Sequence, residues 1–394
     1  MEVKQIYSLM NSVTSEVLGK TEIIAEDLTG LVDLGTEIFN QNAVDNYVKS
    51  LVNHIGKVVF VNRPYNGAVP SVLMDSWEYG SVLEKISADI PEAEENDTWN
   101  LTDKQTYSQD VFYKPTVTAK FFNSRVTFEV PVSITERQVK ESFSSAEQLN
   151  GFLSMIYAAV EKSMTIKTDA LIMRTINNMI AETILADSVA FGGSAGNLTS
   201  ADLSSASTSR AVNLLKLYNT QSGKALTADK AITDPDFIRF ASYTIGVYRD
   251  RLASMSTAFN VGGKARYTPA DRLHVIMLSD FARAAETYLY STTENVDFVR
   301  MPAAETVPFW QGSGKNYDFV STSHITVKES GGKSVEVNGV LGVMFDRDAL
   351  GVSNLDRRVT TNYNAKAEFF NNYYKFDAGF FNDTNENFVV FFAE

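Results

Sequence analysis

The sequence predicts an α+β chain in which one unusually long helix lies between strand-rich segments. Three observations support this fold class: an apolar stripe at helical spacing over 144–184, alternating apolar and polar residues over 111–134, and a second alternating, aromatic-rich region over 339–394. The 394 residues are 44% hydrophobic and 21% charged, close to the composition of folded soluble proteins. We therefore expect the whole chain to fold.

The first segment is an acidic arm. Residues 1–45 contain eight carboxylates and only two cations, with apolar residues scattered among them. This pattern is typical of a weakly amphipathic terminal helix, which we favour over a partner-binding arm. A short helix over 45–56 and a strand over 58–61 should follow, because helical spacing gives way to a β-branched run after Gly56.

The next segment is an acidic loop followed by strands. Between Asp75 and Asp97 there are eight carboxylates and a single cation, Lys85. Residues 111–134 then alternate between apolar and polar side chains, which suits a long two-stranded ribbon exposed on one face.

The strongest helix signal begins at residue 144, where Ser144 and Glu147 match a capping box. A continuous helix to Ile184 would be roughly 60 Å long at about 1.5 Å per residue. The stripe loses its period at 167–169, so a break there is an alternative. A Gly/Ser-rich stretch over 191–209 then indicates a loop or a domain boundary.

An α/β unit is expected over 206–350. Asp234 and Pro235 suit the N-cap and first turn of a helix, and residues 273–279 predict a buried strand that leads into a helix over 280–290. The final region should form two strand pairs.

No pattern in the sequence predicts a catalytic, cofactor or metal site. The absence of cysteine excludes disulfides and thiolate chemistry. The three histidines are widely separated, and glycine clusters at 262–264, 312–315 and 331–334 lack phosphate-loop spacing, so hairpin turns are favoured for the last two. The run from Glu92 to Asp97 lacks calcium-loop spacing, which favours a solvated loop or an intersubunit surface.

Charge and hydropathy exclude two further classes of protein. The formal net charge of -13, without a basic stripe, argues against a specific nucleic-acid reader. No apolar run has the ~18 to 20 residues needed to span a bilayer, and no secretion-signal pattern starts the chain. We expect no membrane association.

The order of segments, and three stretches within it, carry a family resemblance. The stretches are VDNYVKSLVNHIGKVVFVNR at 44–63, YGSVLEKISADI at 79–90 and VPVSITERQVKESFSSAEQLNGFLSMIYAAVEKS at 130–163. They resemble the head proteins of short-tailed phages of the phi-twenty-nine type, and the segment order resembles the Hong Kong 97-type capsid fold. The ending, with GVMFD at 342–346, Arg357-Arg358 and an aromatic hairpin, is similar to that of phage major capsid proteins.

The resemblance implies a division into an N-terminal arm (1–58), an extended loop (59–125), a peripheral domain with a spine helix (126–205), an axial domain (206–350) and return strands of the peripheral domain (351–394). It also implies a non-enzymatic subunit that forms the pentamers and hexamers of an icosahedral or prolate phage head. The implied head encloses double-stranded DNA without gripping it, is assembled in the host bacterial cytoplasm, and uses a separate scaffolding protein and a portal protein.

The acidic loop would then need cations on a neighbouring subunit. Candidate contact residues are Glu84, Glu92, Glu94, Glu95, Arg357 and Arg358, together with cations along the spine helix. Three alternatives stay open: an encapsulin-like compartment shell, a tail-tube protein, and an α/β enzyme built on residues 210–350. The last would need a convergent polar site, which the sequence does not show.

Overall fold

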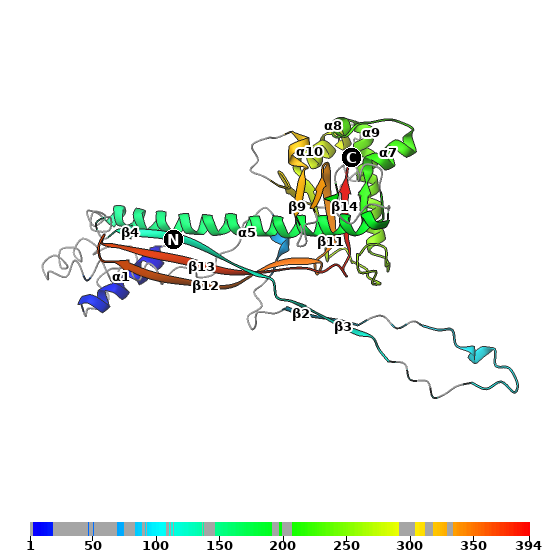
Figure 1. Ribbon diagram of the computed structural model, residues 1–394, viewed down its shortest axis with the longest axis horizontal. Coiled ribbons are helices and arrows are strands. Elements are labelled where there is room, and N and C mark those ends of the chain that lie inside the picture. Colours follow the sequence, from blue (N-terminus) through cyan, green and yellow to red (C-terminus); the bar gives the residue numbers. More distant parts are fainter. Residues whose placement is uncertain are drawn as a thin grey trace.

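The computed structural model describes residues 3–18, 46, 50, 69–74, 83–88, 91, 93–107, 110, 112, 114–135, 137, 146–190, 197–198, 207–290, 304–311, 318–328 and 334–394. Within these residues the strands form four sheets, and the long helix α5 (Ala146–Ala190) runs beside two of them (Figure 1). A second helix, α1 (Val3–Leu18), forms the terminal helix expected in the arm. This mixture of helices and strands confirms the α+β class.

Helix α5 is unbroken through residues 167–169, so the alternative of a break there is wrong. Its 45 residues span about 67 Å at the usual rise per residue. The apolar stripe is interrupted by threonines, but each satisfies its hydroxyl within the helix. Thr168 and Thr175 donate to the carbonyl oxygen four residues earlier, at 3.0 and 2.8 Å. The predicted cap at Ser144 lies outside the described residues.

The predicted apolar stripe of α5 is buried where the structure describes it. Ile156, Tyr157, Val160 and Met164 are all buried. Beyond Met164 burial extends around the helix, because α5 contacts strands of the long four-stranded sheet and strands of the α/β unit. The helix therefore joins the two parts of the molecule.

The four-stranded sheet packs along α5 (Figure 1). Its strand order is β1-β12-β13-β4, with β12 and β13 forming a long antiparallel hairpin. The strands are β1 (Leu73–Met74), which follows the short 3-10 turn Pro70–Val72, β4 (Arg125–Thr135), β12 (Leu350–Asn364) and β13 (Phe369–Asn382).

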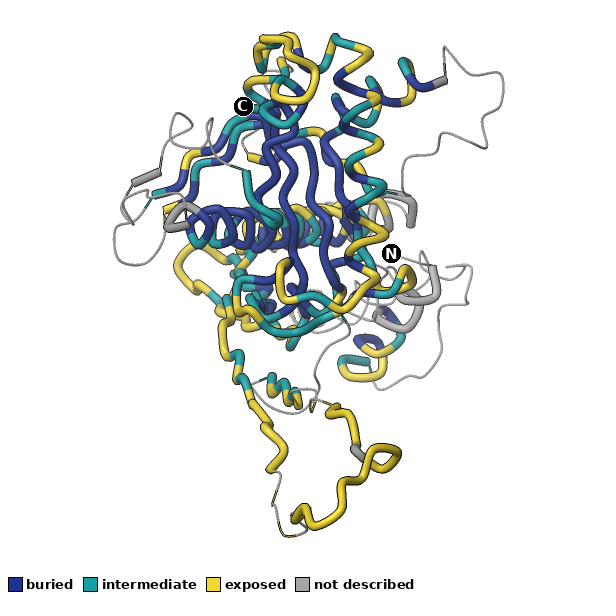
Figure 2. Tube along the Cα trace, turned by 90° about the vertical axis from the view of Figure 1, so that its right-hand side faces the viewer, coloured by how far each residue is buried: buried dark blue, intermediate teal, exposed yellow. Residues whose placement is uncertain are grey.

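The α/β unit is built on a five-stranded sheet in the order β6-β14-β11-β7-β8. Every residue of β11 and β14 is buried, and Figure 2 shows this sheet as the most buried part of the chain. Its strands are β6 (Ala211–Asn213), β7 (Leu273–Leu278), β8 (Glu305–Val307), β11 (Val340–Asp346) and β14 (Phe388–Phe392).

Helices and a small sheet complete this unit. The helices are α7 (Leu214–Ser222), α8 (Ala228–Ala231), α9 (Pro235–Leu252), α10 (Ser279–Tyr290) and α11 (Phe319–Thr322). The small sheet contains β5 (Asn197–Leu198), β10 (Ser334–Val337) and β9 (Ile325–Lys328).

Local predictions in this unit are confirmed. Helix α9 begins with Pro235, and the side chain of Asp234 accepts a hydrogen bond from the Phe237 amide at 2.9 Å. The antiparallel pairing of β9 and β10 confirms the hairpin expected around 331–334, whose turn lies outside the described residues. Residues 312–315 also lie outside them.

The two predicted C-terminal strand pairs are present, but one is nested inside the other. Strand β11 pairs with β14, and the β12–β13 hairpin is inserted between them in the chain. The expected boundary at residue 350 is therefore wrong for β14, which pairs within the α/β unit rather than with the return strands. Similarly, β1 falls in the range expected for the extended loop but pairs with β12.

The ribbon expected over 111–134 is also wrong in its pairing. Strand β3 (Val117–Phe122) pairs with β2 (Leu83–Ala88), whereas β4 pairs with β13. Neither Asn123 nor Ser124, between β3 and β4, has the positive φ that a two-residue hairpin turn needs. The chain therefore continues in the same direction and changes its partner strand at this point.

Candidate assembly interface

A long ribbon projects from the body of the molecule (Figure 1). We define the extended ribbon as residues 83–122, of which the structure describes β2, β3 and most of the connecting tip, including the 3-10 turn Asp97–Trp99. Figure 2 shows most of it as exposed. Trp99 is 94% exposed and Phe112 is 87% exposed, and five further large apolar side chains are exposed along the ribbon: Ile86, Leu101, Tyr107, Val117 and Phe121. Apolar surface of this extent on a projecting segment indicates a protein interface.

The inner end of the ribbon is held by a buried carboxylate. Lys85 of β2 and Lys120 of β3 lie directly opposite each other, a pairing of like charges that is unfavourable by itself. Asp383 resolves it, because its Oδ2 lies 2.8 Å from the Lys85 Nζ and its Oδ1 lies 2.8 Å from the Lys120 Nζ. The Asp383 side chain is only 2% exposed. One carboxylate therefore ties both strands of the ribbon to the body.

Glu386 is the second acceptor at this position. Its Oε1 lies 2.8 Å from the Lys85 Nζ and 3.3 Å from the Nε of Arg266. The Lys85 ammonium also donates to the backbone oxygen of Asp348 at 3.2 Å, so its three donors each have an acceptor. We call Lys85, Lys120, Asp383 and Glu386 the ribbon anchor.

The anchor carboxylates are positioned by the turn between β13 and β14. The Asp383 amide donates to the Ala349 carbonyl at 2.7 Å, and the Asn385 amide donates to the Asp383 Oδ1 at 3.0 Å. Burial alone would raise the pKa of Asp383, but hydrogen bonds from Lys120 and Lys85 outweigh it and hold the pKa below its usual value. Asp383 is therefore charged wherever the ribbon is anchored.

The predicted acidic contact residues lie on the ribbon. Glu84 is exposed on β2, and Glu94 and Glu95 are exposed in the tip. Glu92 lies outside the described residues. Within the described part of this chain, no ion pair joins these glutamates to the predicted arginines, so their role as contacts stays a proposal about neighbouring subunits.

The predicted arginines lie on β12 in the four-stranded sheet. Arg358 already forms ion pairs in its own chain with Asp377, across the hairpin, and with Asp356 at 3.3 Å. Arg357, the preceding residue, is exposed overall, but burial lowers the pKa of its guanidinium, which also interacts with the carboxylate of Glu161 on α5. Arg358 is therefore a weaker candidate for an intersubunit partner than the sequence suggested.

Sequence reasoning missed the ribbon anchor. Lys85 did stand out as the single cation between Asp75 and Asp97, and this was the available signal. Its partners Asp383 and Glu386 are 298 and 301 residues away, in a turn that no sequence pattern linked to the loop.

The histidines lie in structural positions where they are described. His274 is on β7, and burial lowers its pKa. His324 lies between two polar neighbours, with its Nδ1 2.5 Å from the Asn338 Oδ1 and its Nε2 2.8 Å from the Thr326 Oγ1. His54 is outside the described residues. In the part of the chain that the structure covers, no group of three His, Asp or Glu side chains could hold a metal ion, and no helix combines the length and apolar character needed to cross a membrane.

Comparisons with known proteins identify the family. The model of the family described as Phi29-like phage major capsid protein matches residues 10–392. No curated protein matches this chain.

Solved phage structures share this chain's length but little of its sequence. The capsid of Staphylococcus phage Andhra is 9% identical, with 85% of this chain and 86% of that chain covered and a TM-score of 0.45. A chain of the structure of head fiber and inner core protein of native bacteriophage P68 is 9% identical, with 85% and 87% covered and a TM-score of 0.48. TM-scores at this level do not establish a shared fold, so the assignment rests on the family match. The chain belongs to the Phi29-like phage major capsid protein family.

Proposed function

We propose that copies of this chain form pentamers and hexamers that close into an icosahedral or prolate head around double-stranded DNA, in the Hong Kong 97-type manner. The observation that carries this proposal is the extended ribbon. It is anchored at one end by buried ion pairs and exposes Trp99 and Phe112 at the other. Because the ribbon leads away from its own body, these side chains become buried only against another molecule (Figure 1).

The parts of the fold suit distinct roles in such a shell. The α/β unit over 206–350, extended by β14, would make the contacts around each pentamer or hexamer. Helix α5 and the β12–β13 hairpin would form the peripheral domain, together with β4, and the ribbon would lie over a neighbouring subunit. Many modest interfaces repeated by symmetry would then supply the stability of the shell.

The partners follow from the same proposal. Assembly would take place in the host bacterial cytoplasm with a separate scaffolding protein and a portal protein. The net charge of -13 supports the proposal that the packaged DNA lies beside the shell without binding tightly to it, since the negatively charged subunit and DNA repel each other. Family membership supports this capsid role over an encapsulin-like compartment.

Charge pairing between copies is a further part of the proposal. Glu84, Glu94 and Glu95 would face cations of the neighbouring subunit, as would Glu92. Reversing Glu84 and Glu94 to lysine should lower the yield of closed particles, and an unchanged yield would contradict this pairing.

Co-expression of the full chain with the scaffolding protein, followed by negative-stain microscopy, tests the function. We expect closed particles. In a variant whose ribbon tip, residues 93–107, is replaced by a Gly/Ser linker, we expect a folded protein that no longer closes into shells. Glu129→Gln, an exposed change on β4 that breaks an ion pair with Lys375, is the matched control outside the α/β unit and should assemble normally. Persistent monomers from the unchanged chain would contradict the proposal.

A further inference from the structure

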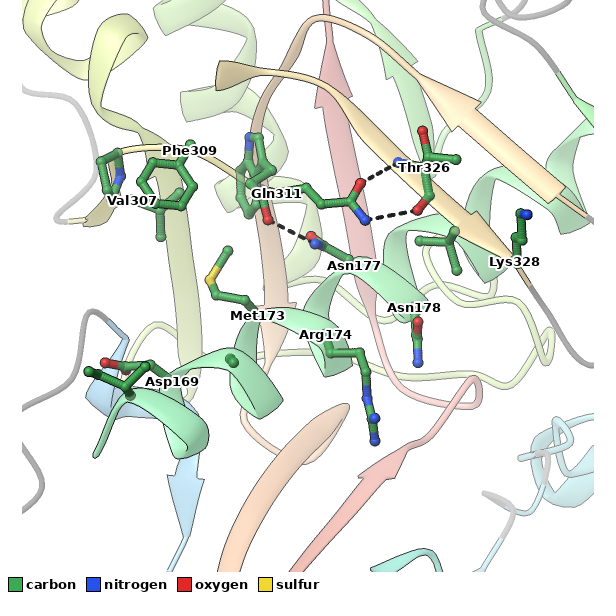
Figure 3. A pocket seen from close by; sticks show the side chains of 15 residues that line it. Asp169, Met173, Arg174, Asn177, Asn178, Val307, Phe309, Gln311, Thr326 and Lys328 are labelled. Carbon is green, nitrogen blue, oxygen red and sulfur yellow. Dashed lines mark hydrogen bonds between the residues drawn. The ribbon is translucent and has the colours of Figure 1, made fainter. Parts of the chain in front are cut away.

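A groove lies between α5, residues 307–311 and strand β9. It encloses about 640 Å³. Met173 of α5 and Phe309 line its apolar part, with Lys328 of β9 at the opposite end from Phe309 (Figure 3). This volume lies within the roughly 300–1,000 Å³ typical of pockets that bind compact ligands.

The walls of the groove are fixed by hydrogen bonds. The Asn177 Nδ2 donates to the Trp310 carbonyl at 2.8 Å, and the Gln311 side chain bonds to both backbone groups of Thr326, at 3.0 and 2.6 Å (Figure 3). The Asn177 Nδ2 and the Gln311 amide group are used within the walls, so the groove is formed before anything enters it, whereas the buried Asn177 Oδ1 has no partner among the described residues. An apolar side chain can therefore occupy the groove without displacing these hydrogen bonds.

The charges at the groove are unevenly distributed. Lys328 lies at the end opposite Phe309, and the one carboxylate in the lining, Asp169, is not at that end (Figure 3). Arg174 contributes to the lining from α5, but its guanidinium points away from Phe309 and Lys328 and lies over the Phe380 ring of β13 at 5.0 Å (Figure 3). The complementary occupant is therefore an apolar side chain carried on an acidic segment.

The tip of the extended ribbon has this chemistry. Residues 93–101 contain three carboxylates and no cation, and they carry the exposed Trp99 and Leu101. The tip is locally ordered, because the Asn96 Oδ1 accepts a hydrogen bond from the Thr98 amide at 2.9 Å at the start of the 3-10 turn. Tryptophan on a preformed turn loses little conformational freedom on binding.

We propose that Trp99 of one copy occupies the groove between α5 and residues 307–311 of a second copy, with Glu94 and Glu95 facing Lys328. The occupant comes from a second copy because the ribbon leads away from its own α5 (Figure 1). This inference rests on the proposed shell function, and it identifies the site on the neighbouring subunit to which the ribbon tip binds.

Cysteine cross-linking tests the proposal directly, since the natural chain has no cysteine. Asn100→Cys places a thiol beside Trp99, and Ala170→Cys places one on the lining of the groove. When assembled particles of the double variant are treated with a short bismaleimide, we expect covalent chains of several subunits on a denaturing gel. Asn100→Cys combined with Lys230→Cys, an exposed position on α8, is the matched control and should stay monomeric on the gel.

A charge exchange gives an independent readout. Lys328→Glu should lower particle yield roughly tenfold, as expected for a reversed interface charge, and adding Glu95→Lys should restore it. Normal particles without the Asn100–Ala170 cross-link, or a cross-link from Ala170→Cys to another protein, would show that the ribbon tip does not bind in this groove. Either result would leave the proposed shell function intact. Failure of the unchanged chain to form particles would instead overturn the proposed function.

Discussion

Replacing Asp383 with asparagine removes the charge that the two ribbon lysines share. Lys85 and Lys120 donate to different oxygens of Asp383, and asparagine replaces one of these two acceptors with a donating amide group, so both hydrogen bonds cannot be kept in this geometry. Lys85 keeps Glu386 and a backbone oxygen, so the loss falls mainly on Lys120. The two ammonium groups then face each other across the ribbon without the carboxylate between them.

The magnitude follows from the burial of the partners. Breaking a buried ion pair costs about 3–5 kcal/mol. The side chains of Lys85 and Lys120 are 21% and 34% exposed, so water compensates for part of this, and we expect about 2 kcal/mol. At about 1.4 kcal/mol per factor of ten, detachment of the ribbon should become roughly 30-fold more frequent.

Hydrogen exchange of the unassembled protein measures this change. A two-stranded ribbon is marginally stable by itself, so amides of β2 and β3 should exchange roughly 30-fold faster in Asp383→Asn once the anchor is weakened. Amides of β11, inside the five-stranded sheet, should keep their protection. Glu286→Gln, which breaks an exposed ion pair with Arg283, is the control and should change neither region. Unchanged exchange in β2 and β3, or an equal acceleration in β11, would refute the anchoring role of Asp383.

Three further predictions concern stability and pH. Trp310→Ala should destabilise the fold by about 3–5 kcal/mol in a denaturant titration, because Trp310 is fully buried and its indole nitrogen donates a hydrogen bond; a loss under about 1 kcal/mol would contradict this. Asp234→Ala should cost about 1 kcal/mol by the same measurement, since it removes the N-cap bond of α9, whereas Thr227→Ala, which removes no cap bond at α8, should cost little. The lowered pKa of Asp383 means that its contribution is fully present above the ordinary aspartate pKa and disappears as the pH falls through the lower folded value. Protease cleavage of the ribbon should therefore increase only in strong acid, and an increase near neutral pH would argue against Asp383 as the controlling group.

Sequence patterns predicted the elements whose signals are local. Helix α5 follows from its apolar stripe, and α9 follows from Asp234 and Pro235, because capping and periodicity involve neighbouring residues. The possible break at 167–169 was wrong because the hydroxyl of Thr168 is satisfied inside the helix, which apolar periodicity does not reveal.

Pairing between distant segments could not be predicted in the same way. The alternation over 111–134 correctly indicated strands, but alternation does not specify a partner, and β3 and β4 join different sheets. The nesting of the C-terminal strands and the ribbon anchor were not predicted for the same reason, because both depend on contacts between residues far apart in the sequence. Lys120 and Asp383 are 263 residues apart, and only the folded chain brings them together.

The nested arrangement also determines when the subunit can finish folding during its synthesis. Strand β14 lies between β6 and β11, so the five-stranded sheet stays open until residues 388–392 have left the ribosome. Asp383 and Glu386 emerge only just before them, so the ribbon made hundreds of residues earlier has no anchor until that moment. We therefore expect the five-stranded sheet and the ribbon anchor to form only after residues 388–392 have been made, and to form slowly, as in other chains with many long-range contacts. A truncated product would lack both the sheet strand and the anchor, and it would not compete with complete subunits for a place in the shell.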